Sequence, residues 1–123
     1  MAKVLVVDDS PTMRRMVMAS LRSLKEVHFN EAGSGLEAIE RLALAPVSLI
    51  ILDMNMPDMH GLDVLKFVSN HREYRYIPVI VLTTKGDEES RNASLAAGAS
   101  IYLTKPFDPV ELASHAQELL RAR

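Results

Sequence analysis

Apolar runs and segments of helical spacing alternate along the whole chain. Five short runs rich in apolar and β-branched residues predict strands, at residues 3–8, 26–32, 48–53, 78–83 and 99–104. The third run is continuously apolar over 49–52, which is typical of a parallel strand covered on both faces. Strand followed by helix, five times over, predicts an α/β fold with one doubly wound, five-stranded parallel sheet and helices on both faces.

Two of the intervening segments carry an apolar stripe, so one face of each predicted helix is expected to be buried. After the first strand the stripe consists of Met13, Met16, Val17, Leu21 and Leu24. On the last segment it consists of Leu112, Ala113, Ala116, Leu119 and Leu120. The stretch 88–97 offers one large apolar residue, Leu95, among alanines and polar residues, so we expect that helix to be weakly anchored.

Polar residues predict where the helices begin and end. Ser10 with Pro11 has the pattern of an N-cap and a first helical position, and 108–111 (DPVE) has that of a capping box. The helix dipole favours acids in a first turn and basic residues in a last turn. Such charges begin the fourth helix and end the last one, at Asp87, Glu88 and Glu89 and at Arg121 and Arg123.

Glycines and methionines mark the loops. The segment 33–35 (GSG) lacks the third glycine and the Lys-Ser/Thr of a phosphate-binding loop, and it predicts a turn before the second helix. Gly61 is expected to supply backbone freedom at the start of the third helix. We expect Met54, Met56 and Met59 to pack around the loop after the third strand.

Composition narrows the class of protein. The chain has 123 residues, 48% hydrophobic and 24% charged, which suits one globular domain over 1–123. A net charge of −2 with scattered Lys and Arg argues against direct nucleic-acid binding. No apolar stretch approaches the roughly 20 residues that span a bilayer, and no signal-peptide pattern begins the chain, so we expect no membrane insertion and a cytoplasmic location. The histidines, His28, His60, His71 and His115, lack the spacing of a metal-binding helix.

Polar side chains follow four of the predicted strands. In open α/β sheets, ligands bind outside the carboxyl ends of the strands, so these side chains are expected to share one site. They are Asp8 and Asp9 after the first strand, Asp53 after the third, Thr83 and Thr84 after the fourth, and Thr104, Lys105 and Pro106 after the fifth.

The acids of this edge predict a divalent cation. Two carboxylates 4 Å apart repel by about 4 kcal/mol at an effective dielectric constant near 20. With Asp8, Asp9 and Asp53 ionised and Lys105 protonated, the local charge is −2, which one Mg²⁺ would cancel. Asp53 is then tolerable at the end of an apolar strand because a cation and water meet it.

Each of these residues has a simpler interpretation when it is taken alone. The pair Asp8 and Asp9 suits a helix cap and dipole partner, and Asp53 suits a loop-entry acid. Thr83 suits a strand, and Lys105 suits a solvated surface charge. Their conjunction at four strand ends favours a shared site.

Four segments resemble the receiver domain of two-component response regulators, and the resemblance covers the full length of the chain. They are VVDDS (6–10), LDMNMPDMHG (52–61), VLTT (81–84) and YLTKPF (102–107). The resemblance implies the flavodoxin-like strand order 2-1-3-4-5, of which chemotaxis receivers are a known example. It also implies that Asp53 accepts a phosphoryl group, that Asp9, Asp53 and the backbone carbonyl of Asn55 bind Mg²⁺, and that Asp8 reaches the ion through water.

The same resemblance implies a switch. Thr83 and Lys105 would receive the phosphoryl oxygens, Tyr102 would be the aromatic switch residue, and the peptide bond between Lys105 and Pro106 would be cis. Phosphorylation would then change a protein-binding surface made of helix four, strand five and helix five. A tyrosine with no role at a strand edge is the alternative for Tyr102.

The implied partners are a sensor histidine kinase and a downstream effector protein. The segment 8–17 (DDSPTMRRMV) is most like stand-alone receivers of the chemotaxis type, whose effector would belong to the flagellar or motility machinery. We expect a phosphoacceptor switch and not an enzyme, and a monomer, with phosphorylation-linked dimerisation left open. One alternative is a receiver domain of a larger regulator with a DNA-binding or enzymatic output domain.

Two other classes are less well supported. A Mg²⁺-dependent phosphohydrolase would need a second acid in a D-x-D pattern, which 53–55 lacks, and residues for a cap domain. An interaction module that is never phosphorylated would not need the complete set of acids and the lysine that this chain has.

Overall fold

The computed structural model describes residues 1–56 and 59–121. The five strands are β1 (Ala2–Val7), β2 (Val27–Ala32), β3 (Leu49–Asp53), β4 (Val79–Thr83) and β5 (Ile101–Thr104). The five helices are α1 (Pro11–Ser20), α2 (Gly35–Leu44), α3 (Gly61–Asn70), α4 (Glu88–Ala96) and α5 (Pro109–Arg121). Each strand lies within two residues of its predicted bounds.

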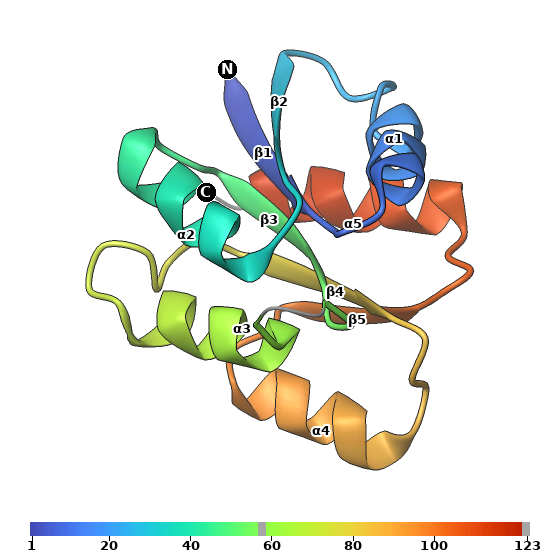
Figure 1. Ribbon diagram of the computed structural model, residues 1–123. Helices are drawn as coiled ribbons and strands as arrows, with labels where there is room; N and C mark the ends of the chain where they lie inside the picture. The colour runs from blue at the N-terminus through green and yellow to red at the C-terminus, as the bar shows by residue number, and fades with distance from the viewer. Residues whose placement is uncertain (57–58, 122–123) are drawn as a thin grey trace.

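All strand pairs are parallel, and the sheet order is β2-β1-β3-β4-β5. Helices α1 and α5 cover one face, and α2, α3 and α4 lie on the other (Figure 1). The predicted fold class and strand order are therefore confirmed.

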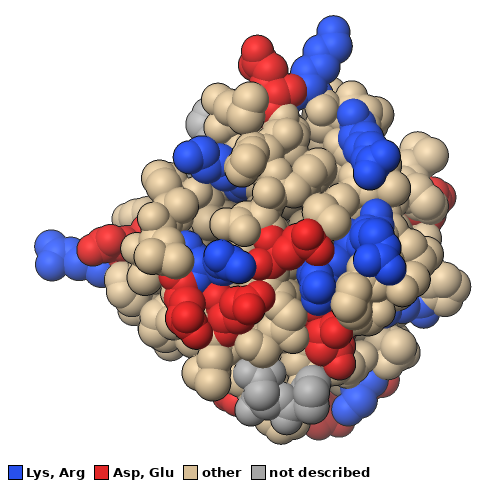
Figure 2. Space-filling view, turned by 45° about the horizontal axis from the view of Figure 1, so that its top comes forward, with Lys and Arg blue, Asp and Glu red and all other residues tan. Residues whose placement is uncertain are grey.

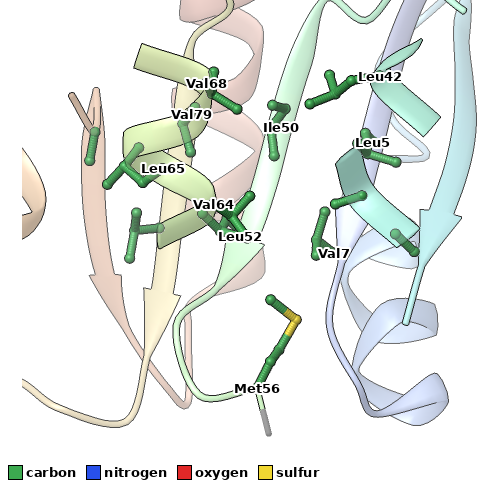
Figure 3. Close-up of a cluster of buried hydrophobic side chains, with 14 residues drawn as sticks. Leu5, Val7, Leu42, Ile50, Leu52, Met56, Val64, Leu65, Val68 and Val79 are labelled. Atoms are coloured by element: carbon green, nitrogen blue, oxygen red, sulfur yellow. The ribbon is translucent and has the colours of Figure 1, made fainter. Parts of the chain in front are cut away.

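Each face of the sheet has its own apolar core. Figure 3 shows the one under α2 and α3, where side chains of β1, β3 and β4 meet those of the two helices. On the other face, Val17 of α1, Leu21 directly after α1, and Leu112 and Ala116 of α5 pack against the sheet. Every residue of β3 and β4 is buried, which explains why these runs lack alternation.

The stripe predicted for the last helix is confirmed, because Leu112 and Ala116 are buried and the other three positions pack partly buried against the same core. The stripe predicted for the first helix is wrong at Met16, which is 51% exposed. The sheet and α5 cover α1 along the line of Val17 and Leu21, and Met16 lies on the flank of that line.

The predicted caps at Ser10 and Asp108 are confirmed, and Asp87, which was predicted only as a charge that favours the helix dipole, also caps its helix. The side chains of Ser10, Asp87 and Asp108 accept hydrogen bonds from backbone N–H groups of Met13, Ser90 and Val110 at 3.2, 2.9 and 2.9 Å. At the predicted turn 33–35, Ser34 caps α2 by accepting from the N–H of Glu37, a cap that we did not predict. Arg121 lies in the last turn of α5, whereas Arg123 lies outside the described residues.

The loop after β3 packs as expected, but the reason for its glycine is different. Met56 is buried, and Met54 and Met59 pack partly buried beside it. Gly61 does not need a left-handed backbone; instead, a Cβ there would lie 2.5 Å from the Cα of Met54 and 2.8 Å from the carbonyl oxygen of Asp53. The close approach of α3 to the end of β3 therefore requires glycine. Pro57 and Asp58 of this loop lie outside the described residues.

Helix α4 has the sparse anchoring that its sequence predicts. Ser94 is its buried residue, and Leu95 packs partly buried against the core. Gly98, just after the helix, has φ +117°, and a Cβ there would meet the hydroxyl of Ser69 at 2.0 Å. A conformation that only glycine readily adopts thus connects α4 to β5.

Charge on the surface is mixed. On the face drawn in Figure 2, Lys and Arg side chains are scattered among acidic ones and form no continuous basic stripe. Among the described helices, none combines the length and the apolar content needed to cross a bilayer.

Candidate functional site

The carboxyl ends of the strands bring the predicted site residues to one edge of the sheet. In the parallel register, Asp53 of β3 lies opposite Leu82 of β4, and Thr83 lies opposite Thr104 of β5. Asp8 directly follows β1, which pairs with β3. Side chains from four separate segments therefore meet because the strands end together.

The three acids form a tight group. Carboxylate oxygens of Asp8, Asp9 and Asp53 all lie within 4.8 Å of one another. Asp8 is 3% exposed and Asp53 is 2% exposed, whereas Asp9 is exposed. We expected water to meet Asp53, but its side chain is almost fully covered, so only Asp9 faces solvent openly.

Lys105 is the cation of the site. Its Nζ lies 3.0 Å from Oδ1 of Asp53 and 3.2 Å from Oδ2 of Asp8, and its side chain is 13% exposed. Burial of the ammonium lowers the pKa of Lys105, but the hydrogen bond to Asp53 and the charge of Asp8 outweigh it, so the pKa lies above its ordinary value. Lys105 is thus firmly protonated and is shared between two acids.

The folded protein disfavours the ionised form of Asp8. Burial raises the pKa of the Asp8 carboxyl above its ordinary value, and the nearby charge of Asp53 raises it further. The N–H of Ser10, which donates to Oδ1 at 2.9 Å, and the ammonium of Lys105 act in the opposite direction without cancelling the effect. The positive charge of Lys105 therefore does not balance the negative charge of the three acids.

Asn55 holds the loop after β3 in place through two hydrogen bonds. Its backbone N–H donates to Oδ1 of Asp53 at 3.1 Å, so this oxygen accepts from both Asn55 and Lys105. The amide side chain of Asn55 donates to the hydroxyl of Thr84 at 3.0 Å, which joins the β3–α3 loop to the β4–α4 loop. We did not predict this second contact, because nothing in the sequence spacing of 29 residues indicates it.

Thr83 and Tyr102 both contact the backbone of Lys85. The buried hydroxyl of Thr83 accepts from the Lys85 N–H at 3.1 Å, and the hydroxyl of Tyr102 donates to the Lys85 carbonyl. Partial burial raises the pKa of Tyr102 above its ordinary value, and the charge of Asp87 adds to this. Both side chains line an open pocket of ≈ 280 Å³ between α3 and α4, which Asn55 also lines.

The backbone at Lys105, just after β5, has two special features. The peptide bond between Lys105 and Pro106 is cis, and the N–H of Lys105 donates to the carbonyl of Thr83 at 2.7 Å. This backbone contact ties the end of β5 to the end of β4, beside the acids.

Sequence reasoning missed one further residue, Arg14 of α1. Its Nη1 donates to the backbone carbonyl of Asp8 at 2.6 Å, and its Nε lies 2.8 Å from Oε1 of Glu31. The position of Arg14 on the helix gives no signal for this, because the reach of a long side chain back to the preceding strand end depends on the tertiary packing.

The residues present fit a hard divalent cation. The donors are carboxylate oxygens, and the site holds three acids and one ammonium, so the local charge is −2 if all are ionised. Among the described residues, the acid triad is the one group of side chains close enough to share a metal ion, and no histidine belongs to it.

Comparisons with known proteins agree with this geometry. Residues 4–117 match the family model described as the response regulator receiver domain. The chain is 44% identical over 108 residues to chemotaxis protein CheY1 of Helicobacter pylori, with 87% of each chain covered. It is 39% identical over 119 residues to a chemotaxis protein CheY homolog of Campylobacter jejuni, covering 96% of this chain and 92% of that one. The solved structure of Vibrio cholerae CheY4 superposes with a TM-score of 0.87 at 37% identity, covering 97% and 98% of the two chains.

Proposed function

The chain belongs to the response regulator receiver domain family, and from this premise we propose that Asp53 accepts a phosphoryl group from a histidine kinase. The protein is a two-component response regulator, and receiver domains are phosphoacceptor switches that work with a histidine kinase and a downstream effector. The observation that carries the assignment to Asp53 is its position. It is the one acid of the triad that lies on a central strand, beside the ammonium of Lys105 and below the hydrogen-bonded loop of Asn55.

The two oxygens of Asp53 have different roles in this proposal. Lys105 and the Asn55 N–H both donate to Oδ1, so we assign Oδ2 as the nucleophile. Oδ2 forms a bond to phosphorus while the bond from phosphorus to the donor's imidazole nitrogen breaks, and the electron pair stays on that nitrogen. Little covalent chemistry is required of the protein, because positioning and charge balance dominate phosphoryl transfer.

The product carries about −2 at Asp53 where the carboxylate carried −1. Lys105 is already 3.0 Å from this side chain, so its contact strengthens with the new charge, and the hydroxyl of Thr83 can donate to a phosphoryl oxygen. The strengthened contact of Lys105 and the new contact of Thr83 distinguish the phosphorylated form, and they supply the free-energy difference that a switch requires.

We propose that Mg²⁺ is bound by Asp9, Asp53 and the backbone carbonyl of Asn55, with Asp8 contacting it through water. When bound, the ion neutralises charge on the transferring phosphoryl group. The chain's own part is to hold three acids within 4.8 Å of one another and to keep Lys105 between two of them.

The output surface is proposed to consist of α4, β5 and α5. Tyr102 lies on β5 and reaches the Lys85 carbonyl in the β4–α4 loop, so a shift of Thr83 would be transmitted to this surface. We infer from the chemotaxis proteins to which the chain is similar that its effector belongs to the motility machinery. We also propose that the chain assists its own phosphorylation and dephosphorylation.

The test is incubation with acetyl phosphate and MgCl₂ followed by intact mass spectrometry. We expect one labile phosphoryl group per chain, which EDTA prevents and Asp53→Asn eliminates. Asp63→Asn is the matched control, because Asp63 is an exposed acid in the first turn of α3 outside the triad. Undiminished labelling of Asp53→Asn would refute the assignment.

The switch itself is tested by hydrogen exchange. With a beryllofluoride mimic of the phosphoryl group, we expect altered amide protection in residues 84–98, which include the β4–α4 loop and the sparsely anchored α4. Identical protection with and without the mimic would mean that this surface does not respond.

A further inference from the structure

Arg14 of α1 contacts the backbone of the site at Asp8. It lies on α1, and its guanidinium bridges the carbonyl oxygen of Asp8 at 2.6 Å and the carboxylate of Glu31 at 2.8 Å. The side chain is only 16% exposed, although Glu31 is 46% exposed. The guanidinium therefore spans the ends of two adjacent strands, β1 and β2, in a well-covered position.

Asp8 is held by four hydrogen bonds, and each holds a different group. Its N–H donates to the carbonyl of Ala32 at 3.0 Å, while Oδ1 accepts from Ser10 and Oδ2 accepts from Lys105. The fourth bond, from Arg14, is the one made to the carbonyl that leads into Asp9. Three contacts thus hold the N–H and the carboxylate of Asp8, and Arg14 holds its backbone carbonyl.

The orientation of that carbonyl determines where Asp9 points. A peptide unit is planar, so fixing the Asp8 carbonyl also fixes the direction of the following N–H and Cα. The side chain of Asp9 is exposed and short, so the position of its backbone limits where its carboxylate can reach. Its oxygen nevertheless lies within 4.8 Å of those of Asp8 and Asp53.

We propose that Arg14 is a positioning residue for the divalent cation site, acting by holding the Asp8–Asp9 peptide so that the Asp9 carboxylate faces Asp53. This inference rests on the proposed function, because it concerns the same Mg²⁺. Glu31 serves as the second anchor that aims the guanidinium.

The proposal predicts an effect opposite in sign to that of charge alone. Arg14 is a cation beside a cation site, so by Coulomb repulsion its removal would tighten Mg²⁺ binding. A positioning role predicts that its removal weakens binding, by about tenfold as for other residues that orient metal ligands. The direction of the change therefore separates the two explanations.

The experiment is calorimetric titration of the purified protein with MgCl₂ alone, without a phosphoryl donor. We expect the Kd of Arg14→Met to rise by about tenfold. Arg15→Met is the matched control, because Arg15 is an exposed residue that removes the same charge from the next position of α1, and it should leave the Kd unchanged or lower it. At saturating MgCl₂, labelling of Arg14→Met by acetyl phosphate should return close to the wild-type rate.

Arg14→Lys keeps the charge and most of the apolar stem but loses the fork that contacts two acceptors at once. A positioning role predicts a Kd several-fold above wild type, and a charge effect predicts no change. The proposal is overturned if either Arg14 variant binds Mg²⁺ as tightly as wild type, and Arg14→Lys alone decides if Arg14→Met does not fold. Failure of the wild-type protein to bind Mg²⁺ would instead refute the proposed function.

Discussion

The acid cluster that makes the site should also limit the stability of the metal-free protein, so Asp8→Asn is expected to raise the free energy of unfolding. Asp8 is 3% exposed, and its oxygen lies within 4.8 Å of that of the equally buried Asp53. Burial and the charge of Asp53 raise the pKa of Asp8, which means that folding disfavours its ionised form. Asparagine has nearly the same shape, carries no charge, and can keep the hydrogen bond from the Ser10 N–H.

The expected gain in the free energy of unfolding is a small difference between large opposing electrostatic effects. At an effective dielectric constant of 20, the carboxylates of Asp8 and Asp53, whose oxygens lie within 4.8 Å of each other, repel by at least about 3.5 kcal/mol. Lys105, at 3.2 Å, attracts Asp8 by about 5 kcal/mol on the same scale. Burying the ion costs several kcal/mol more, and this cost turns the balance against the charge. We expect Asp8→Asn to be more stable by about 1–2 kcal/mol at pH 7 in EDTA.

The pH dependence follows from the direction of the shift. A carboxyl whose folded pKa is raised contributes stability that is fully present below its unfolded value of 3.8 and is lost as pH rises through the folded pKa. The advantage of Asp8→Asn should therefore be larger at neutral pH and should shrink as pH falls toward 3.8.

Magnesium should reverse the order of stability. A ligand at one hundred times its Kd stabilises a protein by about 2.7 kcal/mol, and the variant, with one acid fewer, should gain less than the wild type. Urea unfolding followed by circular dichroism, in EDTA and in MgCl₂, measures both effects, with the exposed acid Glu118→Gln in α5 as control. A variant less stable than wild type in EDTA at pH 7, or the same order in both conditions, would refute the reasoning.

Three further predictions concern packing and the switch. Gly61→Ala should lose at least about 2 kcal/mol of stability and should be labelled more slowly by acetyl phosphate, because its Cβ would meet backbone atoms at 2.5 Å and 2.8 Å. The control is Gly33→Ala, whose Cβ would have its nearest neighbour at 3.4 Å, and it should unfold at nearly the wild-type urea concentration. Leu65→Ala, in the core of α3, should cost about 3 kcal/mol in urea unfolding, and Leu44→Ala, 76% exposed, should cost less than about 0.5 kcal/mol; equal losses would contradict the assigned core. Tyr102→Phe removes the hydroxyl that donates to the β4–α4 loop, so amides of 84–87 should exchange several-fold faster by mass spectrometry while those of β4 stay unchanged.

The architecture was predictable because periodicity and strand-end chemistry are local signals. Fully buried β3 and β4 show as continuous apolar runs, and the βα alternation leaves few arrangements for a parallel sheet. The gathering of Asp8, Asp53 and Lys105 was predictable for the same reason, since parallel strands end at one edge. The cap at Ser10 was predictable because it depends on a residue only three positions away.

What could not be predicted depends on packing between distant segments. Helical spacing places Met16 beside Val17 but does not say how wide a stripe the sheet and α5 cover. Gly61 was expected for its backbone freedom, whereas the separation of α3 from the end of β3 is what excludes a Cβ. The contact of Arg14 with Asp8 needs a long side chain to reach backward from a helix, and spacing alone does not give the direction of such a chain.

The contacts around Lys85 explain how a change at Asp53 could reach the output surface without breaking a hydrogen bond. The hydroxyl of Thr83 accepts from the Lys85 N–H, and it can donate at the same time to a phosphoryl oxygen, because a hydroxyl has one donor and two acceptor sites. A movement of Thr83 toward the phosphoryl group would therefore carry the Lys85 peptide with it. The Lys85 carbonyl accepts from Tyr102, so the same movement would act on β5 and on the loop that leads into α4. Because α4 is held by few buried side chains, a displacement of this loop meets little resistance there, and this helix is where we expect the response to phosphorylation to be largest.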